Sequence, residues 1–171
     1  GIKPSDLEGV VVMKGPGSFT SVRVGVAVAN PFAHQLKIPI VGLTTDEFYR
    51  FKTGESDFLY LQTMNREELY AVGFGKCKTK IKVPIVPLIE LPAGKKILWL
   101  GQVTPEHQAT LPSGYEPISK PKGAQDTWVA VCESVFKIKK AQNAYELIEP
   151  YYGKDAKITP SKRRLIIGKL Q

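Results

Sequence analysis

The chain has 171 residues and a mass of 18.9 kDa, with 43% hydrophobic and 23% charged residues, which is typical of a compact soluble protein. Its longest apolar runs are the length of strands and fall short of the roughly 18 residues that a membrane span needs, so a transmembrane protein is excluded and no membrane contact is expected. The net charge is +8, and much of it lies in the last eighteen residues.

The first 54 residues alternate strand and helix patterns. A β-branched run at residues 9–13 predicts a buried strand, which the glycine and proline turn at 14–17 ends. The next segment reads SFTSVRVGVAVANPFAHQL and predicts a helix, with Ser18 or Thr20 as its cap. A second strand, IPIVGL, and a short helix, DEFYRF, follow. This order predicts a βαβ unit with parallel strands and a right-handed crossover.

After residue 54 the pattern changes to short strands separated by prolines. The segments DFLYLQT, ELYAVGF, KIKVPIVPLI and KILWLG predict strands, and a turn with Asn65 and Arg66 joins the first two as a hairpin. A later segment, AQDTWVAVCESVFKI, predicts an amphipathic helix with Trp128, Val131 and Val135 on one face and Ile138 in line with them. We therefore expect a first lobe at 1–54, a second lobe at 55–149 and a basic tail at 150–171.

The tail allows two interpretations. Its basic residues outnumber its single acidic one, Asp155, and are Lys154, Lys157, Lys162, Arg163, Arg164 and Lys169. Such a cluster is commonly a solvated chain end, although it also attracts phosphates through counterion release. Lys162, Arg163 and Arg164 are therefore the candidate RNA contacts.

The glycine turn is a candidate anion site, because a strand, a glycine turn and a helix N-terminus together favour phosphate. Gly15, Gly17, Ser18 and Thr20 would form it. The turn lacks the Lys of a Walker A loop and the third Gly of the dinucleotide fingerprint. The alternative is a tight turn whose hydroxyls cap the helix.

The helix after the turn carries a stripe of small residues, Gly25, Ala29 and Ala33, that would let another backbone approach closely. The neighbour is either the chain's own sheet or a partner's helix, and the residues alone leave both open. Pro31 should kink or end this helix near 27–30.

No catalytic arrangement emerges from the residues. His34 and His107 are far apart, and so are Cys77 and Cys132, and none stands at metal-ligand, disulfide or nucleophile spacing. Ser18 lies outside a nucleophile elbow. We expect no catalytic residue, no metal and no cofactor.

The run GPGSFTSVRVGVAVANPFAHQLKIPIVGLTT resembles the signature of the TsaB (YeaZ) family, and REELY and the residues Glu-Pro-Tyr-Tyr at 149–152 resemble later landmarks of the same family. The departures from the family pattern include Ser21, Pro31, Thr63, Asn65 and the pair Gly153 and Lys154. The family pattern normally begins with a hairpin, a further strand and a helix that have no counterpart here. We expect that part to be cut off, supplied by another chain or replaced by a partner.

The resemblance implies an α/β, actin-like two-lobed fold of the ASKHA, ribonuclease H-like class, with the first lobe incomplete at its N-terminus. It implies a non-catalytic, cytoplasmic scaffold that pairs with a TsaD-like catalytic paralogue. With a TsaE-like ATPase, the pair would support threonylcarbamoyl transfer to the adenosine beside the anticodon of ANN-decoding tRNAs. The chain would meet tRNA indirectly and would form a homodimer when alone.

In that family the first-lobe helices form the heterodimer interface, and this favours a partner as the neighbour of the small-residue stripe. The expected interface residues are Phe19, Val22, Arg23, Val26, Ala29, Asn30 and Ala33, with Gly25 for helix packing. The His pair of the TsaD metal motif is absent from the sequence. Two alternatives remain: an actin-like nucleotide-binding phosphotransferase that uses residues 15–20, and an RNA-binding module that uses the tail.

Overall fold

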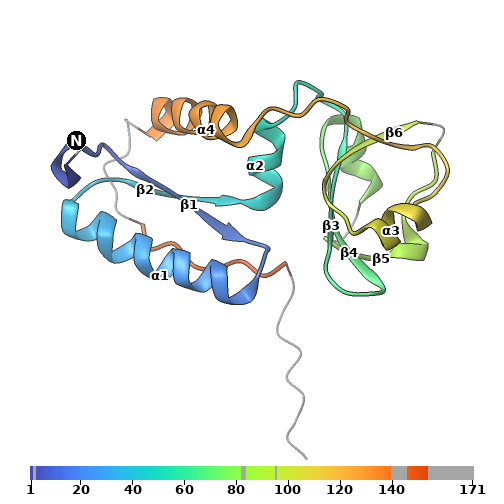
Figure 1. Cartoon of the computed structure of the whole chain (residues 1–171), viewed down its shortest axis with the longest axis horizontal. Helices are drawn as coiled ribbons and strands as arrows, with labels where there is room; N and C mark the ends of the chain where they lie inside the picture. The colour runs from blue at the N-terminus through green and yellow to red at the C-terminus, as the bar shows by residue number, and fades with distance from the viewer. Residues whose placement is uncertain (2, 82–83, 95, 140–145, 154–171) are drawn as a thin grey trace, which may run out of the picture.

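The computed structural model describes residues 1, 3–81, 84–94, 96–139 and 146–153, and its elements form two lobes (Figure 1). The helices are η1 (Pro4–Asp6), α1 (Phe19–Leu36), α2 (Thr45–Phe51), η2 (Gly75–Lys80), η3 (Leu88–Glu90), α3 (Pro105–Thr110) and α4 (Ala124–Lys139). The strands are β1 (Val10–Gly15), β2 (Ile40–Thr44), β3 (Leu59–Thr63), β4 (Glu68–Gly73), β5 (Ile85–Pro87), β6 (Ile97–Gln102) and β7 (Tyr115–Pro117).

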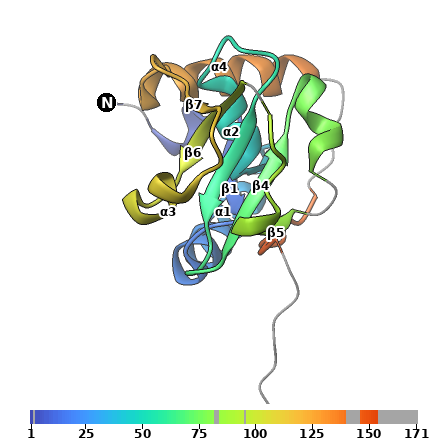
Figure 2. The same cartoon turned by 90° about the vertical axis from the view of Figure 1, so that its right-hand side faces the viewer.

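The first lobe is a helix–sheet–helix sandwich around the parallel pair β1 and β2. Successive strand residues point to opposite faces, so Val12 and Ile40 pack against α1 while Met13 and Leu43 pack on the other side. Figures 1 and 2 show α1 below this sheet and α4 above it. The predicted strand, helix and parallel strand are therefore present.

Helix α1 begins after Ser18, whose carbonyl accepts the first helical bond from Val22 N at 2.9 Å. It ends at Lys37, which adopts a left-handed φ of 53° and donates its N–H to the last turn. Of the two expected effects of Pro31, a kink or an end of the helix, the end is wrong, because α1 continues through Pro31 to Leu36. Pro31 is exposed, and so is Ala27 one turn earlier, so water can reach the carbonyl that loses its helical partner.

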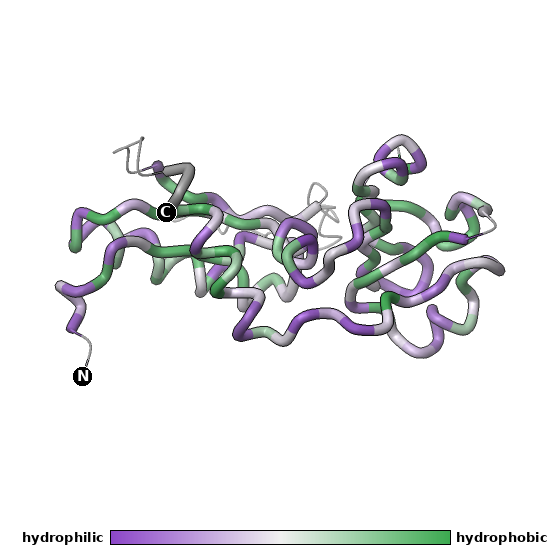
Figure 3. The backbone as a smooth tube through the Cα atoms, turned by 90° about the horizontal axis from the view of Figure 1, so that it is seen from above, coloured by the Kyte–Doolittle hydropathy of each residue, from purple (hydrophilic) through white to green (hydrophobic). Residues whose placement is uncertain are grey.

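The second lobe is built on a five-stranded sheet in the order β5-β4-β3-β6-β7. The predicted hairpin is present as the antiparallel pair β3 and β4, and β6 runs parallel to β3. Figure 3 shows the two lobes side by side, with hydrophobic stretches along the strands of both. The strand predicted in KIKVPIVPLI is limited to β5, because proline cannot donate to a sheet ladder and is confined to edge strands.

The chain returns to the first lobe at α4, inside the range predicted for the second lobe. Trp128, Val131 and Val135 of this amphipathic helix pack against Leu43 and Phe48. The side chain of Ile138 lies outside the described residues, as does the chain from 140 to 145. The first lobe thus combines β1, β2, α1 and α2 with α4, which is distant in sequence.

Helix α2 joins the two lobes. The Tyr49 ring lies 5.0 Å from the Tyr60 ring of the second lobe, measured between centroids. The Tyr70 hydroxyl donates to the Asp46 carboxylate at 3.0 Å. Both the tyrosine pair and the hydrogen bond therefore hold the second-lobe sheet against the start and middle of α2.

Candidate functional site

Helix α1 has a buried face and an exposed apolar face. Val26, Ala29 and Ala33 pack with Val12 and Ile40 in the core of the first lobe. A side-chain carbon at Gly25 would lie 3.9 Å from Val12 Cγ2. The small-residue stripe therefore packs within the chain, which is the internal alternative, because the sheet lies directly beneath it.

The structure divides the seven residues expected at the partner interface. Phe19 and Arg23 are exposed, and the guanidinium carbon of Arg23 lies 4.9 Å from the Phe19 ring centroid. The other five are buried in the chain itself and could meet a partner only if the lobe opened: Val22, Val26, Ala29, Asn30 and Ala33.

Besides Phe19, α1 exposes three large apolar residues that were not among the expected interface residues. Val24, Val28 and Phe32 follow one another at four-residue intervals, which places them on one helix face. Their side chains are 56%, 63% and 41% exposed. The signal was present in the sequence as apolar residues beside the small-residue stripe, but only the position of the sheet shows which side of α1 stays open.

Two other segments of the chain make hydrogen bonds to the glycine turn. The Thr45 hydroxyl donates to the Pro16 carbonyl at 2.6 Å, and Tyr151 N donates to the Lys14 carbonyl at 2.6 Å. Gly15 has a φ of 108°, and an added side-chain carbon there would clash with the Tyr151 carbonyl oxygen. Gly17, Ser18 and Thr20 are exposed at the start of α1, and Ser18 makes no side-chain cap bond.

Residues 146–153 form a C-terminal strap that runs beside α1 and reaches the second lobe (Figure 1). The Asn30 side chain binds the backbone of Ile148, with Nδ2 donating to its carbonyl and Oδ1 accepting from its N–H. Further along, the Tyr152 ring lies 5.1 Å from the Phe19 ring between centroids. The strap thus covers the middle and the N-terminal end of α1.

Asp46 is the buried acid of the lobe junction. Its side chain is 7% exposed, and burial raises its pKa above the ordinary value of 3.8, while hydrogen bonds from Tyr70 and Thr44 oppose that rise. Burial also raises the pKa of the Tyr70 hydroxyl, and the neighbouring Asp46 charge adds to this. The pair is positioned as a structural link between the lobes, with Tyr70 protonated.

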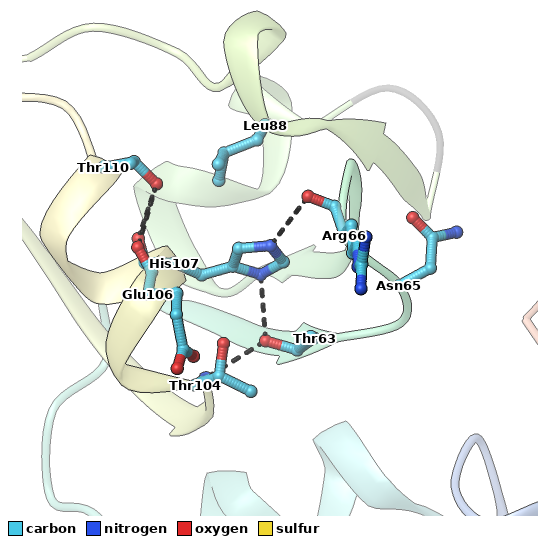
Figure 4. Close-up of a pocket in the computed structure, with 8 residues that line it drawn as sticks. All are labelled: Thr63, Asn65, Arg66, Leu88, Thr104, Glu106, His107 and Thr110. Atoms are coloured by element: carbon cyan, nitrogen blue, oxygen red, sulfur yellow. Dashed lines mark hydrogen bonds between the residues drawn. The ribbon is translucent and has the colours of Figure 1, made fainter.

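An open depression of about 700 Å³ lies at one end of the second-lobe sheet (Figure 4). Its lining residues come from the end of β3, the β3–β4 turn, η3, and α3 with its N-cap. They are Thr63, Asn65, Arg66, Leu88, Thr104, Glu106, His107 and Thr110. No catalytic or metal-binding role was expected for His107 from the sequence, and no local pattern brings these side chains together. Their convergence depends on the parallel pairing of β3 and β6, which local patterns do not reveal.

His107 in this depression is buried and fully bonded. Its Nε2 donates to the Arg66 carbonyl at 3.0 Å, because a carbonyl can only accept, and its Nδ1 lies 3.1 Å from the Thr63 hydroxyl. That hydroxyl also accepts from Thr104 N at 3.1 Å. Both ring nitrogens therefore have hydrogen-bond partners, and these bonds connect α3 to the end of β3 and the β3–β4 turn. His107 has no free ring nitrogen for catalysis.

The described residues contain no group of three or more His, Cys, Asp or Glu that could hold a metal ion. None of the helices in this part of the chain combines the length and hydropathy that crossing a membrane requires. Cys77 is buried and Cys132 half-buried, and both are free thiols. The candidate RNA contacts Lys162, Arg163 and Arg164 lie outside the described residues.

Comparison with known proteins gives short but specific sequence matches. Residues 1–57 match the family model described as TsaD: tRNA N6-adenosine threonylcarbamoyltransferase. The TsaB protein of Bacillus subtilis (strain 168), named for tRNA threonylcarbamoyladenosine biosynthesis, is 50% identical over 44 residues, which are 26% of this chain and 19% of that protein. The TsaB protein of Buchnera aphidicola is 45% identical over 40 residues, 23% of this chain and 19% of that protein.

Two solved structures match over most of the chain. One is an uncharacterised Pseudomonas aeruginosa protein with similarity to peptidase YeaZ, with a TM-score of 0.61, 16% identity, and coverage of 90% of this chain and 76% of that one. The other, YeaZ from the same organism, has a TM-score of 0.55 at 15% identity, with coverage of 88% and 76%. The short sequence matches and the shared fold together support a relationship of this chain to the TsaB (YeaZ) family.

The YeaZ likeness confirms the predicted actin-like α/β fold class of this chain. The sequence matches to the two TsaB proteins each span about a fifth of the relative's length. The TsaB and TsaD patterns overlap in this region, since a tRNA N6-adenosine threonylcarbamoyltransferase from Syntrophus aciditrophicus is also 44% identical over 43 residues, 25% of this chain and 13% of that protein.

Proposed function

We propose that this TsaB-type chain is a non-catalytic subunit that pairs with a TsaD-like protein through the exposed face of α1. Three observations support the pairing: the similarity to TsaB proteins, the family model described as TsaD that matches residues 1–57, and the row of exposed apolar side chains on α1. That row carries the proposal, because apolar side chains in a line on a rigid helix are what a partner's helix would cover.

The partner surface differs from the one expected from the sequence. Its centre is Val24, Val28 and Phe32, with Phe19 and Arg23 at the N-terminal end, while the buried residues of α1 support it from beneath. In the absence of TsaD the same apolar row would pair two copies of this chain. The pairing would serve threonylcarbamoyl transfer to ANN-decoding tRNAs in the cytoplasm, together with a TsaE-like ATPase.

A charge placed in this row tests the proposal. Val28→Asp should weaken binding to a TsaD protein at least a hundredfold in calorimetry, because an unpaired carboxylate would be buried at the interface. The matched control is Val129→Asp on α4, whose side chain is also exposed, at 53%, and which should bind as the wild type does. Unchanged binding by Val28→Asp would overturn the proposed surface.

The alternative phosphotransferase function would require the glycine turn to hold a nucleotide phosphate. The strap lies against this turn through the Tyr151–Lys14 hydrogen bond. We therefore expect titration with ATP and Mg²⁺ to show no binding in the micromolar range. Micromolar binding that is lost in Gly17→Val would favour the phosphotransferase instead.

A further inference from the structure

Three segments that are distant in the sequence carry a concentration of positive charge. Residues 50–52, 76–80 and 120–122 contain only basic residues among their charged side chains. We call these residues the hinge cations, and they are Arg50, Lys52, Lys76, Lys78, Lys80, Lys120 and Lys122. All seven are exposed or half-buried.

Contacts at the end of α2 bring the three segments together. Lys122 N donates to the Lys52 carbonyl at 2.7 Å, so the connection into α4 lies against the chain that leaves α2 (Figure 1). On the other side, the Arg50 guanidinium carbon lies 5.9 Å from the centroid of Phe74, which directly precedes η2 and Lys76. These contacts link the three segments that carry the hinge cations at the end of α2, and we call this group of residues the band.

Aromatic rings hold the central members of the band in place. Lys52 Nζ lies 5.1 Å from the Tyr49 ring centroid, and Arg50 rests on Phe74 in the same way. A cation packed on a ring loses less side-chain freedom when it binds an anion, while its charge stays at the surface. The Tyr49 and Phe74 rings are half-buried and each has a cation over it, so they are poor platforms for stacking bases.

Little negative charge neutralises the band. Among the described residues, the ion pairs within 4.0 Å are Lys76 with Asp57, at 3.8 Å, and Lys96 with Glu116, at 3.1 Å. Lys76 remains accessible, since its side chain is 90% exposed. The other hinge cations have no carboxylate at that distance within this part of the chain, so their charge is available to a ligand.

We infer that the hinge cations bind the phosphate backbone of an RNA. This inference rests on the proposed function, in which the partner complex acts on tRNA, and it adds a direct contact between the tRNA and the lobe junction of this chain. Cations that lack stacking rings beside them contact phosphates and do not recognise individual bases. RNA binding should therefore be independent of the base sequence and steeply dependent on salt concentration. The described hinge segments contain none of the exposed large hydrophobic residues that a membrane surface would accept.

The experiment compares two triple variants of the full chain by fluorescence anisotropy with an unmodified tRNA transcript. The hinge variant carries Lys52→Gln, Lys120→Gln and Lys122→Gln. The tail variant carries Lys162→Gln, Arg163→Gln and Arg164→Gln, which removes the same charge from the other candidate RNA contacts. The hinge variant should bind at least tenfold more weakly than the tail variant, and its slope of log affinity against log salt should be about 2 to 3 smaller than that of the wild type.

Each other outcome overturns the inference. Loss of binding in the tail variant alone would assign the RNA contact to the tail, and equal losses would indicate a bulk charge effect. Equal binding of polyglutamate or of anionic phosphatidylserine vesicles, with the same dependence on the hinge cations, would assign the band to an acidic protein or a lipid surface. Calorimetry of both variants with TsaD tests the proposed function separately. If the hinge variant binds TsaD normally but does not lose RNA binding, the RNA inference is wrong and the proposed pairing with TsaD is unaffected.

Discussion

The side chain of Asn30 holds the backbone of Ile148 through two hydrogen bonds, Nδ2 to the carbonyl at 2.8 Å and the N–H to Oδ1 at 3.0 Å. An amide that satisfies both backbone groups of one residue acts as a short piece of sheet edge. Asn30 is itself 9% exposed on the inner side of α1. This pair therefore fixes where the C-terminal strap crosses the helix.

Replacing Asn30 by Ala should destabilise the protein by about 1–3 kcal/mol, because the half-buried N–H and carbonyl of Ile148 would lose their partners. Denaturant unfolding measures the loss, and hydrogen exchange at the Ile148 amide should speed up well beyond the change at β1. Gln35→Ala, on the exposed side of the same helix, is the control and should change stability by less than about 0.5 kcal/mol. Slow exchange at Ile148 in the Asn30 variant would show that the strap is held by other contacts.

Two glycines near each other in sequence should respond in opposite ways to alanine. Gly15→Ala places a side chain at a φ of 108° and against the Tyr151 carbonyl oxygen, so it should destabilise by more than about 1 kcal/mol. Gly25→Ala adds a methyl group 3.9 Å from Val12 and improves helix propensity, so it should be neutral or stabilise by up to about 1 kcal/mol. Thermal unfolding of the two variants checks the contrast, and a destabilised Gly25→Ala would show that α1 lies closer to the sheet than described.

The Asp46–Tyr70 link predicts a pH dependence of stability with a definite sign. Burial raises the pKa of Asp46 in the folded protein above 3.8, so the unfolded chain releases this proton at lower pH than the folded one. The contribution of Asp46 to the free energy of unfolding is therefore greatest below pH 3.8 and declines as the pH rises through the raised pKa.

Asp46→Asn isolates that contribution, since the amide oxygen can still accept from Tyr70 but carries no charge. The stability of the wild type relative to this variant should fall as the pH rises above 3.8, in urea unfolding series at matched ionic strength. A difference that stays constant as the pH rises would mean that the carboxylate has the same pKa in the folded and unfolded states.

The sequence predicted the elements of the first lobe well because each has a local cause. A β-branched run, a glycine turn and a long small-residue helix can be recognised from neighbours alone, and Lys37 to Pro39 mark the end of α1. The second-lobe hairpin was likewise visible from alternating residues around Asn65 and Arg66.

The parts that the sequence did not predict depend on long-range packing. The return of α4 and the strap to the first lobe is decided by contacts such as Val131 with Leu43, which no local pattern encodes. The same cause separates the two faces of α1. The sheet covers the stripe of small residues and leaves Val24, Val28 and Phe32 exposed, and only the folded structure shows which face is which. The hinge cations are basic residues of ordinary spacing that only the lobe junction brings together.

The central claim is that the exposed face of α1 recruits a TsaD-like protein. Size-exclusion chromatography with light scattering, on this chain alone and mixed with a TsaD protein, tests it most directly. We predict a one-to-one complex that replaces any homodimer formed by the chain alone, because both would use Val24, Val28 and Phe32. A well-folded chain that elutes unchanged in the presence of TsaD would contradict the account.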